Sequence, residues 1–183
     1  ASSTAVRCGC ESAAVALGRS APPDAIRAGL IAADDALRSG EGATTLVVAV
    51  IDGGGGLWAS RIGDSTILLV TEDDGHEVFA ANTDDDLVTV STAALPFSAG
   101  NSGREIDIVE MVHLEVPVTA TVVLATDGIA EPWRDGPTTV APSLALLATA
   151  RPSALELTAW ADFSRAGCHD DRTLVMLWRR PVG

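Results

Sequence analysis

Apolar residues recur at helical spacing over the N-terminal part of the chain. From Ala1 to a stop at Gly18, small apolar residues predict a first helix. A second helix is predicted to begin at Pro22, because proline suits the first helical turn, and to continue to Leu37 with apolar residues every three or four positions. Two helices are therefore expected before the first strand.

The next segments are apolar and β-branched, with short glycine-rich breaks between them. Residues 44–51 are almost continuously apolar, which is typical of a strand covered on both faces. Residues 52–56 are predicted to turn this strand back into a second one that ends at Ile62. Gly63-Asp64-Ser65 is then predicted to form a tight hairpin into residues 66–70, so the three strands form an antiparallel meander.

The C-terminal half alternates further strands with two helices. Strands are predicted at Ile106–Val116, with a bulge near Glu110-Met111, at Thr121–Ala125 and at Arg172–Trp178, and helices at Ala141–Thr149 and Ser153–Arg165. This order of elements favours two antiparallel sheets packed face to face with helices outside. The sequence therefore predicts an α+β sandwich rather than an alternating βαβ fold.

Composition narrows the partners that the chain can bind. Its 183 residues, 47% of them hydrophobic, suit one domain over residues 1–183. The formal net charge is -13, and every basic residue is Arg. The electrostatic field of this negative charge repels nucleic acid and anionic lipid, so neither nucleic acid nor a membrane is an expected partner. Cations and basic protein segments are favoured instead.

The three cysteines do not form the pattern of a disulfide framework. Cys8 and Cys10 lie two positions apart in a predicted helix, which points them to different sides, and we interpret them as small buried packing residues. Cys168 precedes His169, but no second Cys/His pair with ligand spacing supports a zinc site. A reducing compartment, the cytoplasm, is therefore expected.

Three short motifs place aspartates at the edges of apolar strand-like runs. They are Gly63-Asp64-Ser65, Thr126-Asp127-Gly128 and His169-Asp170-Asp171-Arg172-Thr173. Carboxylate oxygens are preferred by hard divalent cations, so the pattern favours Mg²⁺ or Mn²⁺ over zinc or haem. Each acid also has a simpler interpretation: a helix cap for Asp127, turn chemistry for Asp64 and a solvated turn acid for Asp170.

In this order, and after Gly42-Ala43-Thr44-Thr45-Leu46, the motifs resemble those of the PP2C-type (PPM) metal-dependent Ser/Thr protein phosphatases of bacteria. The resemblance covers most of the chain and implies an αββα four-layer sandwich. It also implies hydrolysis of phosphoserine and phosphothreonine in proteins by a water activated by two metal ions. The implied cofactors are two or three Mg²⁺ or Mn²⁺ ions. The implied partners are a phosphorylated protein substrate and a Ser/Thr kinase.

The resemblance carries metal-ligand roles to particular residues. Asp127 and Asp170 match ligands of the catalytic metal pair, and Asp64 matches a ligand of a weaker third site. Asp171 stands where the family usually has Asn, and Arg172 stands where it usually has an apolar residue. If the register shifts by one position, Asp171 is the ligand in place of Asp170.

Asp52-Gly53-Gly54 looks like the metal-bridging Asp-Gly-x-Gly-Gly motif of the family. In the family that motif precedes the Gly-Thr-Thr strand, whereas Asp52 follows the corresponding strand of this chain. We therefore interpret Asp52 as a turn residue. The true counterpart, with the phosphate-binding Arg, is expected upstream of Ala1. Residues 1–183 alone are therefore expected to be inactive or nearly so.

The alternative function is a catalytically inactive PP2C-like module with a regulatory or binding role. The absent first motif and the departures at Asp171 and Arg172 favour it, whereas retention of Asp127 and Asp170 favours the enzyme.

Overall fold

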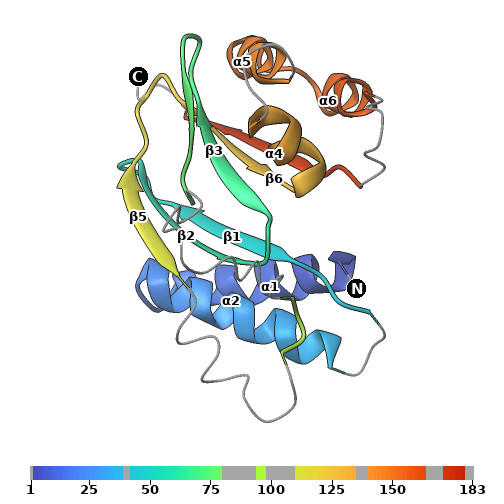
Figure 1. The fold of residues 1–183 in the computed structure, drawn as a ribbon. Coiled ribbons are helices and arrows are strands. Elements are labelled where there is room, and N and C mark those ends of the chain that lie inside the picture. The colour runs from blue at the N-terminus through green and yellow to red at the C-terminus, as the bar shows by residue number, and fades with distance from the viewer. Residues whose placement is uncertain are drawn as a thin grey trace, which may run out of the picture. The chain divides into compact units, whose positions relative to one another are not determined.

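The computed structural model describes residues 2–38, 42–79, 94–97, 110–134, 140–163 and 171–179. The chain divides into two compact units, Ala1–Asp64 with Asn82–Glu115 and Ser65–Ala81 with Val116–Gly183. Each unit combines one antiparallel sheet with helices (Figure 1). The predicted α+β class, with two antiparallel sheets and flanking helices, is therefore confirmed.

The first unit begins with the two predicted helices, α1 (Ser2–Leu17) and α2 (Pro22–Leu37). They meet backbone to backbone, because a Cβ atom added to Gly29 would lie only 2.9 Å from the carbonyl oxygen of Gly9. Alanines on both helices are buried beside this contact, which explains why the apolar positions of α1 are small.

The sheet of the first unit has the strand order β1-β2-β5, and all its pairs are antiparallel. The strands are β1 (Leu46–Ile51), β2 (Gly56–Ile62) and β5 (Met111–Glu115). Leu46, Val50 and Ile62 pack against apolar side chains of α2. The strand predicted from Thr44 begins later, because Thr44 instead forms an isolated bridge with Leu95. Of the predicted strand Ile106–Val116, residues 106–109 lie outside the described residues.

The first strand is less buried than its sequence predicted. Leu46 and Val50 of β1 are buried and its other four residues are partly buried, so the predicted covering of both faces holds only in part for β1. All five residues of β3 (Thr66–Val70) are buried, so β3 fits that description. Within the described residues, β3 lies between β4 and β6 in its sheet, whereas β1 pairs only with β2.

A buried carboxylate, paired with a partly exposed arginine, holds the loop segment that carries Leu95 and Phe97. Asp34 of α2 has no exposed surface, and its Oδ1 accepts a hydrogen bond of 2.7 Å from the backbone N–H of Phe97. Its Oδ2 accepts from Nε and Nη2 of Arg38 at 3.1 and 2.6 Å. The carboxylate therefore joins the last turn of α2 to a segment 63 positions away in sequence.

The second unit contains a four-stranded sheet with the order β4-β3-β6-β7. Its other strands are β4 (Gly75–Glu77), β6 (Thr121–Ala125) and β7 (Leu174–Trp178). The predicted meander from β2 into β3 is wrong, because β3 pairs with β4 and β6 and not with β2. Both edges of β2 are already occupied by β1 and β5, so β3 has no free edge of that sheet to join.

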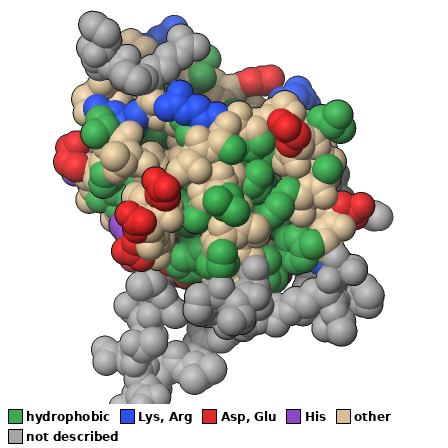
Figure 2. All heavy atoms as spheres, turned by 90° about the horizontal axis from the view of Figure 1, so that it is seen from above, with side chains coloured by type: hydrophobic (Ala, Val, Ile, Leu, Met, Phe, Trp, Pro, Cys, Tyr) green, Lys and Arg blue, Asp and Glu red, His purple; other side chains and the backbone are tan. Residues whose placement is uncertain are grey.

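In the described part of this unit, three helices accompany the sheet: α4 (Asp127–Arg134), α5 (Ala141–Ala150) and α6 (Ala154–Ala161). Leu144 and Ala148 of α5 pack with β-strand residues in the core of the unit. Ser153 caps α6 with a capping box that includes Glu156. The outer side of this layer is not uniformly polar, since Leu146 and Leu155 are 70% and 79% exposed. Figure 2 shows apolar side chains across the middle of this face and acidic ones toward its rim.

Two further sequence expectations concern the membrane and the cysteines. Among the described residues, no helix is both long enough and apolar enough to cross a membrane. Cys8 and Cys10 are free thiols. Cys8 is partly buried, but Cys10 is exposed, so the buried-packing interpretation is wrong for Cys10. It follows Gly9, which faces α2, and therefore lies on another side of α1.

Candidate metal centre

Hydrogen bonds join the end of β6 to the start of β7. The last paired residues are Ala125 and Leu174, and just beyond them the N–H of Thr126 donates to the carbonyl of Thr173 at 3.2 Å. The Thr126 hydroxyl accepts from the Thr173 N–H at 3.0 Å and donates to the Asp171 carbonyl at 3.2 Å. Thr126, the residue before Asp127, is therefore bonded to the segment that enters β7. Two acid-bearing motifs that are distant in sequence thus meet where these neighbouring strands end and begin.

Asp127 is the first residue of α4. The carbonyl of Thr126 accepts from the N–H groups of Ile129 and Ala130, both at 3.0 Å, and these bonds start the helix. The Asp127 carboxylate is partly buried, and its Oδ1 accepts from the Gly128 N–H at 2.8 Å. Its Oδ2 has no hydrogen bond to any residue that the structure describes. A helix N-terminus favours a carboxylate there, and one oxygen remains available to a cation.

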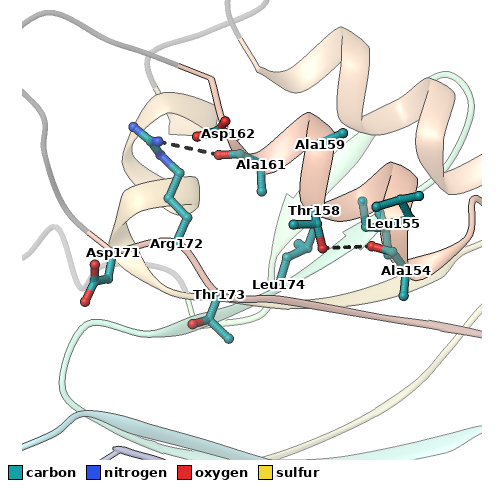
Figure 3. A pocket seen from close by; sticks show the side chains of 11 residues that line it. Ala154, Leu155, Thr158, Ala159, Ala161, Asp162, Asp171, Arg172, Thr173 and Leu174 are labelled. Atoms are coloured by element: carbon teal, nitrogen blue, oxygen red, sulfur yellow. Dashed lines mark hydrogen bonds between the residues drawn. The ribbon is translucent and has the colours of Figure 1, made fainter.

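The two residues that depart from the family pattern point in different directions. Asp171 is exposed, and its carboxylate points away from the Arg172 guanidinium (Figure 3). Arg172 instead donates from Nε to the Gly128 carbonyl at 3.3 Å and from Nη1 to the Ala161 carbonyl at 3.5 Å. Arg172 therefore makes structural contacts within the second unit.

The remaining predicted ligands are placed as follows. Asp170 lies outside the described residues. Asp64 is partly buried, two residues beyond the end of β2, and belongs to the first unit, whereas Asp127 belongs to the second. The predicted hairpin at Asp64 is wrong, since the strands on its two sides belong to different sheets. Within the described ranges, no three His, Cys, Asp or Glu side chains are grouped to hold a metal ion.

Asp52 forms the predicted turn between β1 and β2. Its Oδ1 accepts from the N–H groups of Gly54, Gly55 and Gly56 at 2.8, 2.8 and 3.0 Å. The hydrogen bond from Gly56 is the main reason why the pKa of Asp52 lies below its ordinary value, with smaller contributions from Gly54, Gly55 and the charge of His113. The carboxylate is thus engaged in closing its own turn, and the interpretation of Asp52 as a turn residue is confirmed.

Comparisons with known proteins give no match at the level of sequence. No family model matches the chain, and no curated protein matches it. Solved structures do match. A PPM Ser-Thr phosphatase, MsPP from Mycobacterium smegmatis in complex with cacodylate, aligns with a TM-score of 0.59 and 17% identity over 97% of this chain and 81% of its own. The catalytic domain of the serine threonine protein phosphatase PstP, in complex with 2 manganese ions, aligns with a TM-score of 0.55 and 20% identity over 94% and 79%.

The chain has the PP2C-type (PPM) phosphatase fold.

A third structure with this fold is described as a C. elegans sex determining protein. It aligns with a TM-score of 0.61 and 16% identity over 91% of this chain. The chain spans 50% of the length of that protein. At such identities the likeness concerns the PP2C fold, while the chemistry of this chain depends on its own residues.

The hydrogen bonds between the two acid-bearing segments of this PP2C fold were not anticipated from the sequence. They depend on the Thr126 hydroxyl, which lies between an N–H of residue 173 and a carbonyl of residue 171. A threonine directly after one strand and another directly before the next was the only available signal, and such residues are common at strand ends.

A surface hollow of about 710 Å³ lies between α6 and the residues that enter β7 (Figure 3). Its wall includes apolar Leu155 and Leu174 and the charged side chains of Asp162, Asp171 and Arg172. The Arg172 guanidinium is held by carbonyls, whereas neither carboxylate is bonded to a described residue. Among the described lining residues, two carboxylates stand against one guanidinium, so the net charge is negative, which disfavours a phosphate group.

Proposed function

We propose that the chain is the phosphatase domain of a metal-dependent Ser/Thr protein phosphatase and that its two units act as one domain over residues 1–183. The observation that carries the proposal is the bonding of Thr126 to Thr173 and Asp171, which joins the Asp127 motif to the segment entering β7. The PP2C fold supports it, as does the Ser/Thr phosphatase activity named for two proteins with that fold.

The proposed ligands are Asp127 and Asp170 for the catalytic ions and Asp64 for a third, weaker site. Asp127 fits a hard divalent cation, because it offers a carboxylate oxygen that no described residue occupies. Mg²⁺ and Mn²⁺ both accept such ligands, and a PstP structure is described as a complex with 2 manganese ions. When bound, such ions would activate a water toward phosphorus and neutralise charge on the departing oxygen.

The chain's own residues would prepare this site in three ways. Thr126 ties the two ligand-bearing segments together, and α4 directs its N-terminus toward the Asp127 carboxylate. The net charge of -13 favours phosphoproteins whose phosphorylated residue lies near basic residues. A Ser/Thr kinase that phosphorylates the same proteins is the proposed partner. Free thiols at Cys8 and Cys10 suit the reducing cytoplasm.

The test is release of inorganic phosphate from a phosphothreonine peptide by the full-length protein. We expect turnover with Mn²⁺, loss of turnover after chelation with EDTA and recovery when Mn²⁺ is returned. Residues 1–183 alone are expected to bind Mn²⁺ with little turnover. Full turnover in EDTA would contradict a metal-dependent mechanism.

A binding module without catalysis is the second candidate. It is favoured by the segment entering β7, where Arg172, in place of the usual apolar residue, makes contacts that hold the fold. For such a module, the intact protein would bind a phosphopeptide or Mn²⁺ without releasing phosphate. The same assay, run beside a binding measurement, therefore separates the two candidates.

A further inference from the structure

The first turn of α4 contains a carbonyl group that the helix itself leaves without its usual donor. A regular α-helix pairs the carbonyl of residue 128 with the N–H of residue 132. Residue 132 is proline, which has no N–H, and it lies inside α4. Gly128 is buried, so its carbonyl needs a donor from elsewhere.

Arg172 supplies that donor. Its Nε lies 3.3 Å from the Gly128 oxygen, and its Nη1 lies 3.5 Å from the oxygen of Ala161, the last residue of α6. Figure 3 shows the side chain extended toward Ala161. One guanidinium therefore bonds to the carbonyl groups of two helices.

An aromatic pair holds this guanidinium in place. The Arg172 Cζ atom lies 4.2 Å from the centroid of the Phe163 ring, and Phe163 packs edge-on against Trp160 at 5.8 Å. The Trp160 indole N–H in turn donates to the Ser143 hydroxyl of α5 at 3.2 Å. The planar cation is therefore fixed from its face as well as from its edge, and lysine would not reproduce this arrangement.

We propose that Arg172 is a positioning residue for Asp127. By completing the first turn of α4 at the Gly128 carbonyl, it fixes the direction of the carboxylate on the preceding residue. The effect on a bound cation rests on the proposed function, whereas the effect on α4 does not. Outer-shell groups that orient a metal ligand typically change metal affinity by about 10- to 100-fold.

The test is a double-mutant cycle of Arg172→Leu and Pro132→Ala, because alanine at position 132 restores the missing N–H. Arg172→Leu is expected to raise the hydrogen-exchange rates of the Ile129 and Ala130 amides about tenfold and to weaken Mn²⁺ binding, measured by calorimetry, by about tenfold. The double variant is expected to recover most of both losses. Arg179→Leu, which removes another guanidinium bonded to a carbonyl of this unit, is expected to change neither.

Each outcome decides one of the two claims. If the double variant exchanges as fast as Arg172→Leu alone, or if Arg172→Leu leaves the α4 amides unchanged, Arg172 does not act through the Gly128 carbonyl and the proposal is overturned. If the amides follow the cycle while the wild-type protein binds no Mn²⁺, the role of Arg172 in α4 stands and the proposed metal-dependent function fails.

Discussion

Asp127→Ala is expected to abolish metal-dependent phosphate release by the intact protein, with kcat/KM falling at least about a hundredfold, because even outer-shell partners of metal ligands contribute about 10- to 100-fold. The variant removes the carboxylate whose Oδ2 has no partner among the described residues. The fold should survive, since the loss at the N-terminus of α4 is about 1 kcal/mol or less. Phosphate release and circular dichroism measure the two effects.

Asp162→Ala is the matched control for this variant. Asp162 is also an acid of the second unit, it is exposed, and its carboxylate is bonded to no described residue. We expect it to retain wild-type turnover. If Asp127→Ala also retains wild-type turnover, Asp127 is only a helix-terminal residue, as the simpler interpretation of its motif holds.

Asp34→Ala is expected to lower the free energy of unfolding by about 3 kcal/mol, because removing one partner of a buried ion pair typically costs about 3–5 kcal/mol. The substitution leaves the Phe97 N–H and the Arg38 guanidinium without their acceptor. We place the effect at the lower end of that range, since the Arg38 side chain is 30% exposed and partly solvated. Urea unfolding, monitored by tryptophan fluorescence, measures the change.

The neighbouring residue offers a control with the same chemistry. The Asp35 side chain is 66% exposed and lies 3.5 Å from Arg38 in a contact that water screens. Asp35→Ala is therefore expected to change the free energy of unfolding by about 0.5 kcal/mol or less. Equal effects of the two substitutions would show that burial of Asp34 does not stabilise the first unit.

The elements that the sequence predicted well are those set by local periodicity. α1 and α2 follow from apolar spacing with proline and glycine at their ends, and β6 follows from an unbroken apolar run. The pairing of β3 could not be predicted in the same way. A short turn before it suggested a hairpin, but the choice of partner depends on which strand edges remain free, and that is a property of the whole sheet.

In the candidate site, too, the features set by local sequence were predictable and those set by distant contacts were not. The position of Asp127 just beyond the end of β6 follows from its motif, because aspartate and glycine are disfavoured within strands. The role of Arg172 depends on a carbonyl 44 positions away that lacks its helical donor. Proline four residues after Gly128 signals the missing donor, yet only the folded chain reveals which side chain replaces it.

The most direct test of the metal centre is an anomalous difference map from crystals of this protein grown with Mn²⁺. We expect a peak within about 2.0–2.6 Å of a carboxylate oxygen of Asp127, the range for hard divalent cations, with Asp170 as a second ligand. A map in which Mn²⁺ binds elsewhere, or not at all, while the Asp127 carboxylate is well ordered and uncoordinated would contradict the proposed site.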